Sequence, residues 1–169
     1  TISGITIDEV LTLGEGVTSD ITTSSTATVP VFSTDLWDGN NGTQTINTGI
    51  DLSNGDGMVW IKNRTSNWEP MIFDTELGPE RYSITSGTQT YNRSNSGSGD
   101  NDTLSSFNSD GFDIGPMAAV NQSGEDYVSW TFRKAPGFFD VIHYTGDGTT
   151  NQEFSHSLEI GRASCRERV

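Results

Sequence analysis

The sequence predicts an all-β domain of the β-sandwich type. Short runs of β-branched and aromatic residues recur along the chain, turn-forming Gly, Asn, Asp and Ser separate them, and no stretch has the period of a long helix. The 169-residue chain is polar, with 31% hydrophobic residues and 19 Gly, yet its 8 Phe, 4 Trp and 4 Tyr can fill a core. Many short strands joined by polar turns favour a sandwich, and a jelly-roll arrangement is the form we expect.

The first strands are expected after a polar start. Residues 1–30 are rich in Thr and Ser and are interpreted as the end of a preceding segment or a linker. Residues 32–37 and 43–50 flank a Gly/Asn turn and predict a hairpin. Further strands are predicted at residues 58–62, which should be central in a sheet, at 71–73 and at 81–85.

The second half of the chain continues this pattern. Residues 87–102 are rich in Ser, Gly and Asn and predict a long exposed loop. A strand pair is expected at residues 104–107 and 111–114, around a turn. Residues 127–132 alternate strictly, so that one face of this strand must pack in a core. Trp60 and Trp130 lie in the middle of strands and are expected to be core residues.

One stretch occurs twice. Residues 37–50 and 144–158 both have an aromatic strand end, a Gly/Asn/Asp turn, Thr and Gln, and then two apolar residues four apart. Such repetition is typical of modular proteins. We therefore expect one module at residues 31–136 and the start of a second, truncated module at residues 137–158, whose residues 138–144 should open it as a strand.

Charge and the C-terminal composition exclude several classes of protein. The net charge of −14 argues against nucleic acid and against an anionic membrane surface, because both require basic residues. No apolar run approaches the ~20 residues that span a bilayer. Residues 159–169, which contain the single cysteine, resemble a translated sequencing adapter, so we interpret them as a non-biological tail and leave them out of the fold.

Few residues suggest catalysis. His143 and His156 are the two histidines, and we expect structural or exposed roles, since a catalytic histidine needs an orienting partner. Asp74 and Glu76 could form the carboxylate pair of a glycosidase, but Asp74 is better explained as a cap on the turn that follows it. We therefore expect no catalytic residues and a protein that is not an enzyme.

Two kinds of binding site remain open. Acidic residues beside Gly, Asn or Ser could bind Ca²⁺, and Asp100 with Asp102 would form the most plausible site. The same residues are also what ordinary turns require. Trp68 and Trp37 lie near turns and are the candidates for stacking on a sugar, with Trp68 the better one because a polar run precedes it. No other cofactor is expected.

Four segments together resemble an uncharacterised, repeated domain of marine bacteriophage tail-fibre and virion structural proteins. They are Met-Val-Trp-Ile-Lys-Asn-Arg at 58–64, Phe-Asp-Thr at 73–75, Ser-Phe-Asn-Ser-Asp-Gly-Phe at 106–112 and Tyr-Val-Ser-Trp-Thr-Phe-Arg-Lys-Ala-Pro at 127–136. The resemblance covers most of residues 32–158 and depends on the order and spacing of the segments. The chain departs from it at Glu76-Leu77-Gly78, where that family often has a basic residue before the glycine, which weakens any role for a charge pair there.

The resemblance implies a structural or adhesion module in a virion, in a tail fibre or on the tail surface. It further implies a concanavalin-like jelly roll, other virion proteins as partners, contact with a host surface polysaccharide, a homo-oligomer and an environmental phage as the source. It implies no catalytic residues. Two alternatives stay open: a carbohydrate-binding module of a secreted bacterial adhesin or enzyme, and a glycan-cleaving tail spike.

Overall fold

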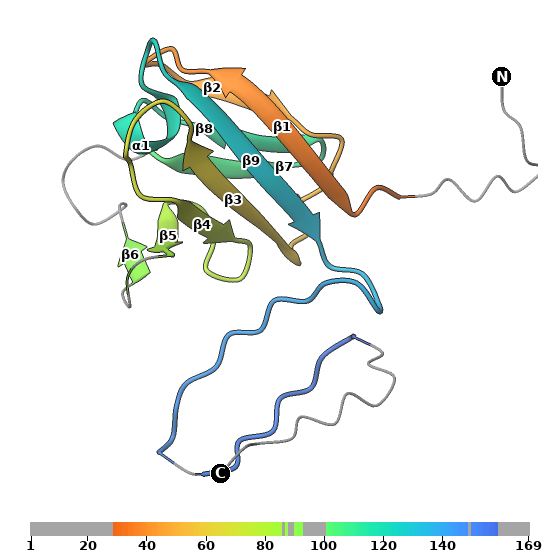
Figure 1. The fold of residues 1–169 in the computed structure, drawn as a ribbon. Helices are drawn as coiled ribbons and strands as arrows, with labels where there is room; N and C mark the ends of the chain where they lie inside the picture. Colours follow the sequence, from red (N-terminus) through yellow and green to blue (C-terminus); the bar gives the residue numbers. More distant parts are fainter. Residues whose placement is uncertain (1–28, 86, 88–89, 93–100, 149, 159–169) are drawn as a thin grey trace, which may run out of the picture.

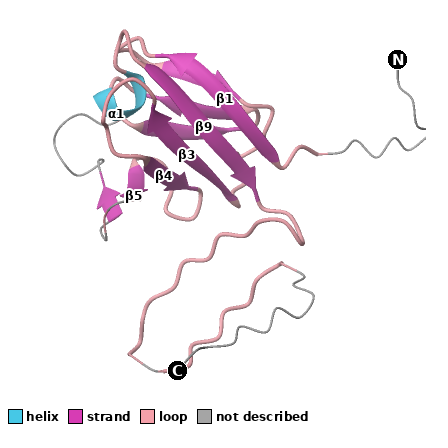
Figure 2. Cartoon of the chain, viewed as in Figure 1, coloured by secondary structure: helices cyan, strands magenta, loops and turns pink. Residues whose placement is uncertain are grey.

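The chain folds into two antiparallel β-sheets packed face to face, which confirms the all-β sandwich (Figures 1 and 2). The computed structural model describes residues 29–85, 87, 90–92, 101–148 and 150–158. The larger sheet has the strand order β1-β9-β3-β4-β5-β6 and the smaller one β2-β8-β7. The elements are β1 (Phe32–Asp38), β2 (Gln44–Asn47), β3 (Gly57–Asn63), β4 (Met71–Asp74), β5 (Arg81–Ile84), β6 (Thr90–Asn92), β7 (Leu104–Asn108), β8 (Gly111–Ile114), the helical turn α1 (Ala118–Asn121) and β9 (Asp126–Arg133).

The core lies between the two sheets and follows the alternation of the strands. In β3, Val59 and Ile61 are fully buried and point inward, while the residues between them face outward. Burying each such side chain contributes about 1.5–3 kcal/mol. The largest buried apolar side chains of the core are Tyr127, Phe73, Phe112, Ile50, Leu52, Ile61, Leu104, Ile114, Val59 and Val120.

Most of the predicted strands are present. The residues predicted to form a central strand lie in β3, which pairs with β9 on one side and β4 on the other. The predicted pair around residue 110 is the β7–β8 hairpin. The loop expected at residues 87–102 is partly wrong, because β6 forms within it and pairs with β5 as the edge strand of the larger sheet. Among the described residues, no helix has the length and apolar character needed to cross a membrane.

The hairpin expected between residues 32–37 and 43–50 is wrong. β1 pairs with β9 and β2 pairs with β8, so the chain crosses from one sheet to the other between them. The buried amide of Asn121 holds this crossing: its Nδ2 donates to Asn40 Oδ1 (3.0 Å) and to the Gly42 carbonyl (2.8 Å), and its Oδ1 accepts the Asn40 amide (3.0 Å). The side chain of Asn121, a residue distant in sequence, therefore forms hydrogen bonds with backbone groups that would have paired with each other in a hairpin.

The strand expected at residues 138–144 is not formed. Residues 138–148 and 150–158 run as irregular chain beside the sandwich (Figure 1), and among these described residues the β-pairing is one bridge, from Ala135 to Phe139. A strand needs a neighbouring ladder to satisfy its backbone, and β1, the corresponding segment of the first copy, obtains one from β9. Residues 1–28 and 159–169, which carry the expected linker and tail, lie outside the described residues.

Candidate binding face

The face of the larger sheet that points away from the core carries the aromatic residues of β9. Tyr127, Ser129 and Thr131 are fully buried and point inward, so Trp130 and Phe132 point outward. The expectation that Trp60 and Trp130 belong to the core is therefore wrong, since both lie half-buried on this outer face. The small side chains of Ser129 and Thr131 stand beside Ile61 and Val59 in the register and leave room for them between the sheets.

Five rings on this outer face enclose a shallow groove, called the aromatic groove below. It has a volume of about 340 Å³ and is lined by Phe32, Trp60, Trp130, Phe132 and Phe138. The strand register sets its cross-strand pairs: the rings of Trp60 and Trp130 are 5.3 Å apart between centroids, and those of Phe32 and Phe132 are 5.0 Å apart. Each tilted pair is worth about 0.5–1.5 kcal/mol beyond its buried area.

The aromatic groove is uncharged although the chain carries a net charge of −14. On the same face of β1, β9 and β3, the charged residues are Asp38, Asp126 and Lys62, and the register places them toward the opposite end of the strands. Leu36, 64% exposed, extends the apolar surface along β1. Large contiguous apolar patches are rare on the exposed surface of monomeric proteins, and they commonly mark the place where another molecule binds.

The aromatic groove lies beside the chain that leads from β9 into the second repeated stretch. Phe132 of β9 contacts Phe32 of β1, and it also contacts Phe139 (ring centroids 5.2 Å apart), which lies five residues before the second repeated stretch as Phe32 lies five residues before the first. Phe138, which lines the groove, stacks on Phe132 at 6.4 Å. Phe132 therefore makes aromatic contacts both with β1 and with the chain that follows β9, one tilted and one stacked.

Ionic contacts hold the same junction. Lys134 Nζ lies 3.1 Å from Asp140 Oδ1 and 3.3 Å from Asp56 Oδ1, so it joins the chain after β9 to the turn before β3. Asp140 also accepts the amide of Ser157 at 2.7 Å. The Ser157 amide first, and then the Lys134 ammonium, lower the pKa of Asp140 to about 2. The Asp140 carboxylate in turn raises the pKa of Lys134.

Trp37 is not a surface residue, so its predicted role as a sugar platform is wrong. It is 7% exposed, its ring stacks on Tyr127 (centroids 5.6 Å apart), and its Nε1 donates to the carbonyl of Val120 at 3.1 Å. The turn beside Trp37 suggested exposure, but Trp37 faces inward from β1 in register with Tyr127.

Trp68 is exposed, as its candidate role requires. Its side chain is 43% exposed in the loop between β3 and β4, and Lys62 Nζ donates to its carbonyl oxygen at 2.6 Å. Together with Met71, Met117 and neighbouring residues it lines a smaller hollow of about 190 Å³. Trp68 is absent from the lining of the aromatic groove, so the two sites are separate.

The acidic candidates occupy different places. Asp74 caps the turn as predicted, because its Oδ1 accepts the Leu77 amide at 2.8 Å and its carbonyl accepts the Gly78 amide at 3.1 Å. His143 Nε2 lies 3.1 Å from the same Oδ1. Asp102 precedes β7, and Asp100 lies outside the described residues, so the Ca²⁺ site remains a prediction. Among the residues that the structure describes, no three metal-ligating side chains cluster.

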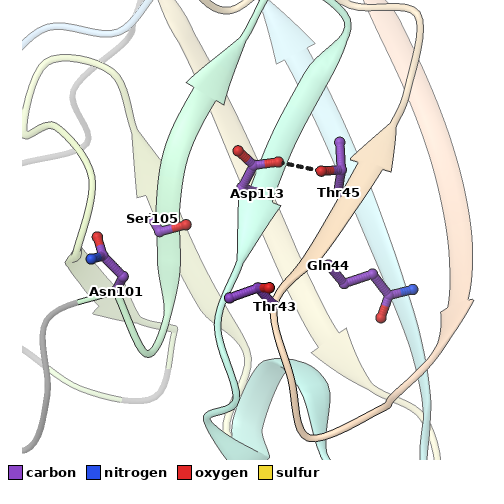
Figure 3. A pocket seen from close by; sticks show the side chains of 6 residues that line it. All are labelled: Thr43, Gln44, Thr45, Asn101, Ser105 and Asp113. Atoms are coloured by element: carbon purple, nitrogen blue, oxygen red, sulfur yellow. Dashed lines mark hydrogen bonds between the residues drawn. The ribbon is translucent and has the colours of Figure 1, made fainter.

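A second groove, called the polar groove below, lies on the smaller sheet and was not predicted from the sequence. Its volume is about 350 Å³, and Figure 3 shows its lining residues: Thr43, Gln44, Thr45, Asn101, Ser105 and Asp113. Thr45 donates to Asp113 Oδ1 at 2.6 Å, and Ser106 donates to Asp113 Oδ2 at 2.7 Å.

Partial burial acts to raise the pKa of Asp113, but hydrogen bonds from Thr45, Ser106 and Asn108 outweigh it and lower this pKa below the usual value. The sequence does show polar residues alternating with the buried Ile46 and Phe112, and this alternation could have indicated a polar outer face on the smaller sheet. The contacts among them depend on strand pairing, which the sequence pattern alone does not give.

Comparison with known proteins places the chain in a family. No curated protein and no solved structure matches it significantly. Residues 28–138, more than half of the chain, match the model of a domain of unknown function, DUF7483, and the chain therefore belongs to this family.

Proposed function

We propose that the chain is a structural and adhesion module of a phage virion protein, in a tail fibre or on the tail surface. It works as one unit of a repeated array, in which neighbouring copies pack through the aromatic groove and exposed polar surface contacts the host glycan. The oligomer in the virion, the partners among other virion proteins and the contact with host polysaccharide are parts of this proposal.

The observation that carries the proposal is the position of the aromatic groove at the junction of the two repeat copies. Phe132 contacts equivalent phenylalanines of both copies, Phe32 and Phe139, and Phe138 of the junction lines the groove. A neighbouring copy would bring the same kind of aromatic side chain to the groove, so it is the occupant that would extend the contact between phenylalanines. The groove is also uncharged, so that two acidic copies can meet there with less repulsion than elsewhere on their surfaces.

Self-association tests the packing role. Sedimentation velocity at about 0.15 M salt, where the Debye length is ~8 Å, should show concentration-dependent association of the full chain. Truncating a central aromatic residue of an interface commonly costs 2 kcal/mol or more, so Trp130→Ser should weaken association about 30-fold or more. Trp68→Ser is the matched control, because it removes an exposed tryptophan from outside the groove and should leave association unchanged.

Two results would contradict the packing role. One is a wild-type chain that stays monomeric up to about 1 mM, a concentration at which a contact of only ~4 kcal/mol would already be half formed. The other is Trp130→Ser associating as well as wild type while it remains folded by urea titration. The virion assignment has its own test, which is the sequence of the neighbouring genes: capsid and tail genes support it, and secretion or hydrolase genes oppose it.

The neighbouring genes also separate the first alternative, a carbohydrate-binding module of a secreted bacterial adhesin or enzyme. The exposed Trp68 and the polar groove favour glycan contact in either setting. A glycan-cleaving tail spike would need two carboxylates about 5–10 Å apart in a cleft. The aromatic groove has no carboxylate in its lining, while the polar groove and the hollow beside Trp68 each have one, Asp113 and Glu69, which counts against this alternative.

A further inference from the structure

We propose that the polar groove of the smaller sheet binds a neutral glycan, with Asp113 accepting hydrogen bonds from the hydroxyl groups of a sugar. This inference rests on the adhesion part of the proposed function. It adds a location, a ligand class and a set of residues to that part.

Strand register builds the centre of the polar groove. Thr45 on β2 and Ser106 on β7 both stand opposite Asp113 on β8, and a bulge between Leu104 and Ser106 sets the second of these pairs. Each hydroxyl donates to a different carboxylate oxygen, at 2.6 and 2.7 Å. A carboxylate has about four acceptor sites, so Asp113, which also accepts a hydrogen bond from Asn108, keeps capacity for a ligand while these bonds hold the group in one orientation.

The rest of the lining matches a ligand that is rich in hydroxyl groups. Thr43, Ser105 and Asn101 surround Asp113 with two hydroxyls and an amide, groups that both donate and accept hydrogen bonds (Figure 3). The volume of about 350 Å³ lies in the range of small-molecule sites, which runs from about 300 to 1,000 Å³. The groove therefore has both the size and the polarity for part of an oligosaccharide.

Charge excludes the other polar ligands. Among the residues that the structure describes, no lysine or arginine lines the polar groove. Asp113 stays ionised at neutral pH and the chain has a net charge of −14, so phosphate, sulfate and uronate groups are repelled. A divalent cation would need more oxygen ligands than one carboxylate with hydroxyl neighbours, and among the described residues no acidic cluster supplies them. A neutral glycan is the ligand class that remains.

The lining also sets the expected strength of binding. None of the described residues that line the groove has an aromatic ring on which a sugar could stack, and exposed hydrogen bonds contribute little net free energy, so a dissociation constant of about 1 mM per site is expected. An array of modules that bind one polysaccharide together can raise the overall affinity by about 10²–10⁴. Weak single sites are therefore compatible with firm attachment of a particle.

The test is a ¹H–¹⁵N titration of the full chain in EDTA-containing buffer. Neutral glycans are first screened on a printed array. The neutral probes of the titration are then cellohexaose, laminarihexaose and mannohexaose, and a galacturonic acid hexamer is the anionic probe. The expected result is a saturable shift of the Thr45, Ser105 and Asp113 amides with at least one neutral glycan and none with the anionic hexamer. Asp113→Asn should weaken this binding about tenfold, because bonds to an ionised acceptor are roughly twice as strong as neutral ones.

Two controls make the result specific. Asp38→Asn removes the same charge from the end of β1 on the other sheet and should change the binding less than twofold. Ser105→Gln fills the groove without replacing a residue that bonds to Asp113, and it should abolish binding. Spectra of all variants report whether the fold is kept.

The possible outcomes separate this inference from the proposed function. If no neutral glycan shifts any groove amide, the inference is wrong, while packing through the aromatic groove is unaffected. If shifts appear instead around Trp68 and disappear in Trp68→Ala, the inference is wrong but the adhesive function stands. Binding of the anionic hexamer in the polar groove would also overturn it.

Discussion

Replacing Thr131 by valine should make this domain more stable. Thr131 is fully buried on the inner side of β9, and its hydroxyl finds no hydrogen-bond partner among the described residues. Burying an unpaired hydroxyl costs about 1–3 kcal/mol. Thr131→Val removes that group with little change in shape, so the free energy of unfolding should rise by about 1 kcal/mol, taking the lower end of this range. In a domain of this size the gain corresponds to about 4 °C in Tm.

A matched substitution should act in the opposite direction. Thr103 is also fully buried, but its Oγ1 donates to Glu80 Oε2 at 3.1 Å. Hydrogen bonds to charged groups contribute about 1.5–3 kcal/mol, so Thr103→Val should lower the free energy of unfolding by about that amount. The assay is urea unfolding followed by tryptophan fluorescence, with an unchanged m-value as the sign that only stability has changed.

The comparison of these two variants decides whether the reasoning holds. A Thr131→Val domain that loses 0.5 kcal/mol or more at constant m, a change beyond that of an ordinary surface substitution, would mean that the hydroxyl makes a bond in the folded state. Equal losses in both variants would show that valine is harmful at either position for reasons of packing. The first result would refute the assignment of Thr131 as an unpaired hydroxyl, and the second would refute the prediction that valine stabilises the domain at this position.

Three further predictions concern a tightly packed glycine, the tryptophans and Asp140. Gly39→Ala should destabilise the domain by about 3 kcal/mol in urea unfolding, because a Cβ there would lie 2.0 Å from a backbone carbonyl oxygen. Trp37→Ala should cost about 3–5 kcal/mol in the same assay, and the exposed Trp68→Ala should stay within about 0.5 kcal/mol of wild type. The lowered pKa of Asp140 means that its contacts are fully stabilising above pH 3.8 and are lost as the pH falls through about 2. The Ser157 amide shift of the folded domain should therefore titrate with a midpoint of about pH 2, and this titration should be absent in Asp140→Asn.

Strand positions were predictable from the sequence because local pattern sets them. The apolar run of β3 and the alternation of β9 each produced a strand where one was expected. The inward face of β9 was not predictable in the same way. Large aromatic residues occupy both faces, and the pattern alone favoured Trp130 over the small Ser129 and Thr131 that the core accepts.

The path of the chain between strands depends on contacts that are distant in sequence. The Asn121 amide binds Asn40, 81 residues away, and this contact separates β1 from β2 where a local turn had suggested a hairpin. The polar groove has the same origin, since Thr45 and Asp113 are 68 residues apart. A single sequence does not show such pairs, so the binding surfaces were less predictable than the elements that carry them.

The adjacent ends of β1 and β9 determine how the module would respond to mechanical load. Phe32 stands opposite Phe132, and the Arg133 amide donates to the Val31 carbonyl at 2.9 Å, so the chain enters and leaves the sandwich at the same corner. A force applied along a tandem array would pass through this corner and leave the rest of the sandwich unloaded. The force would break the hydrogen bonds between β1 and β9 one after another, starting at this corner, and would not shear all of them at once. Each module would then lengthen in small steps under load, which makes the array compliant.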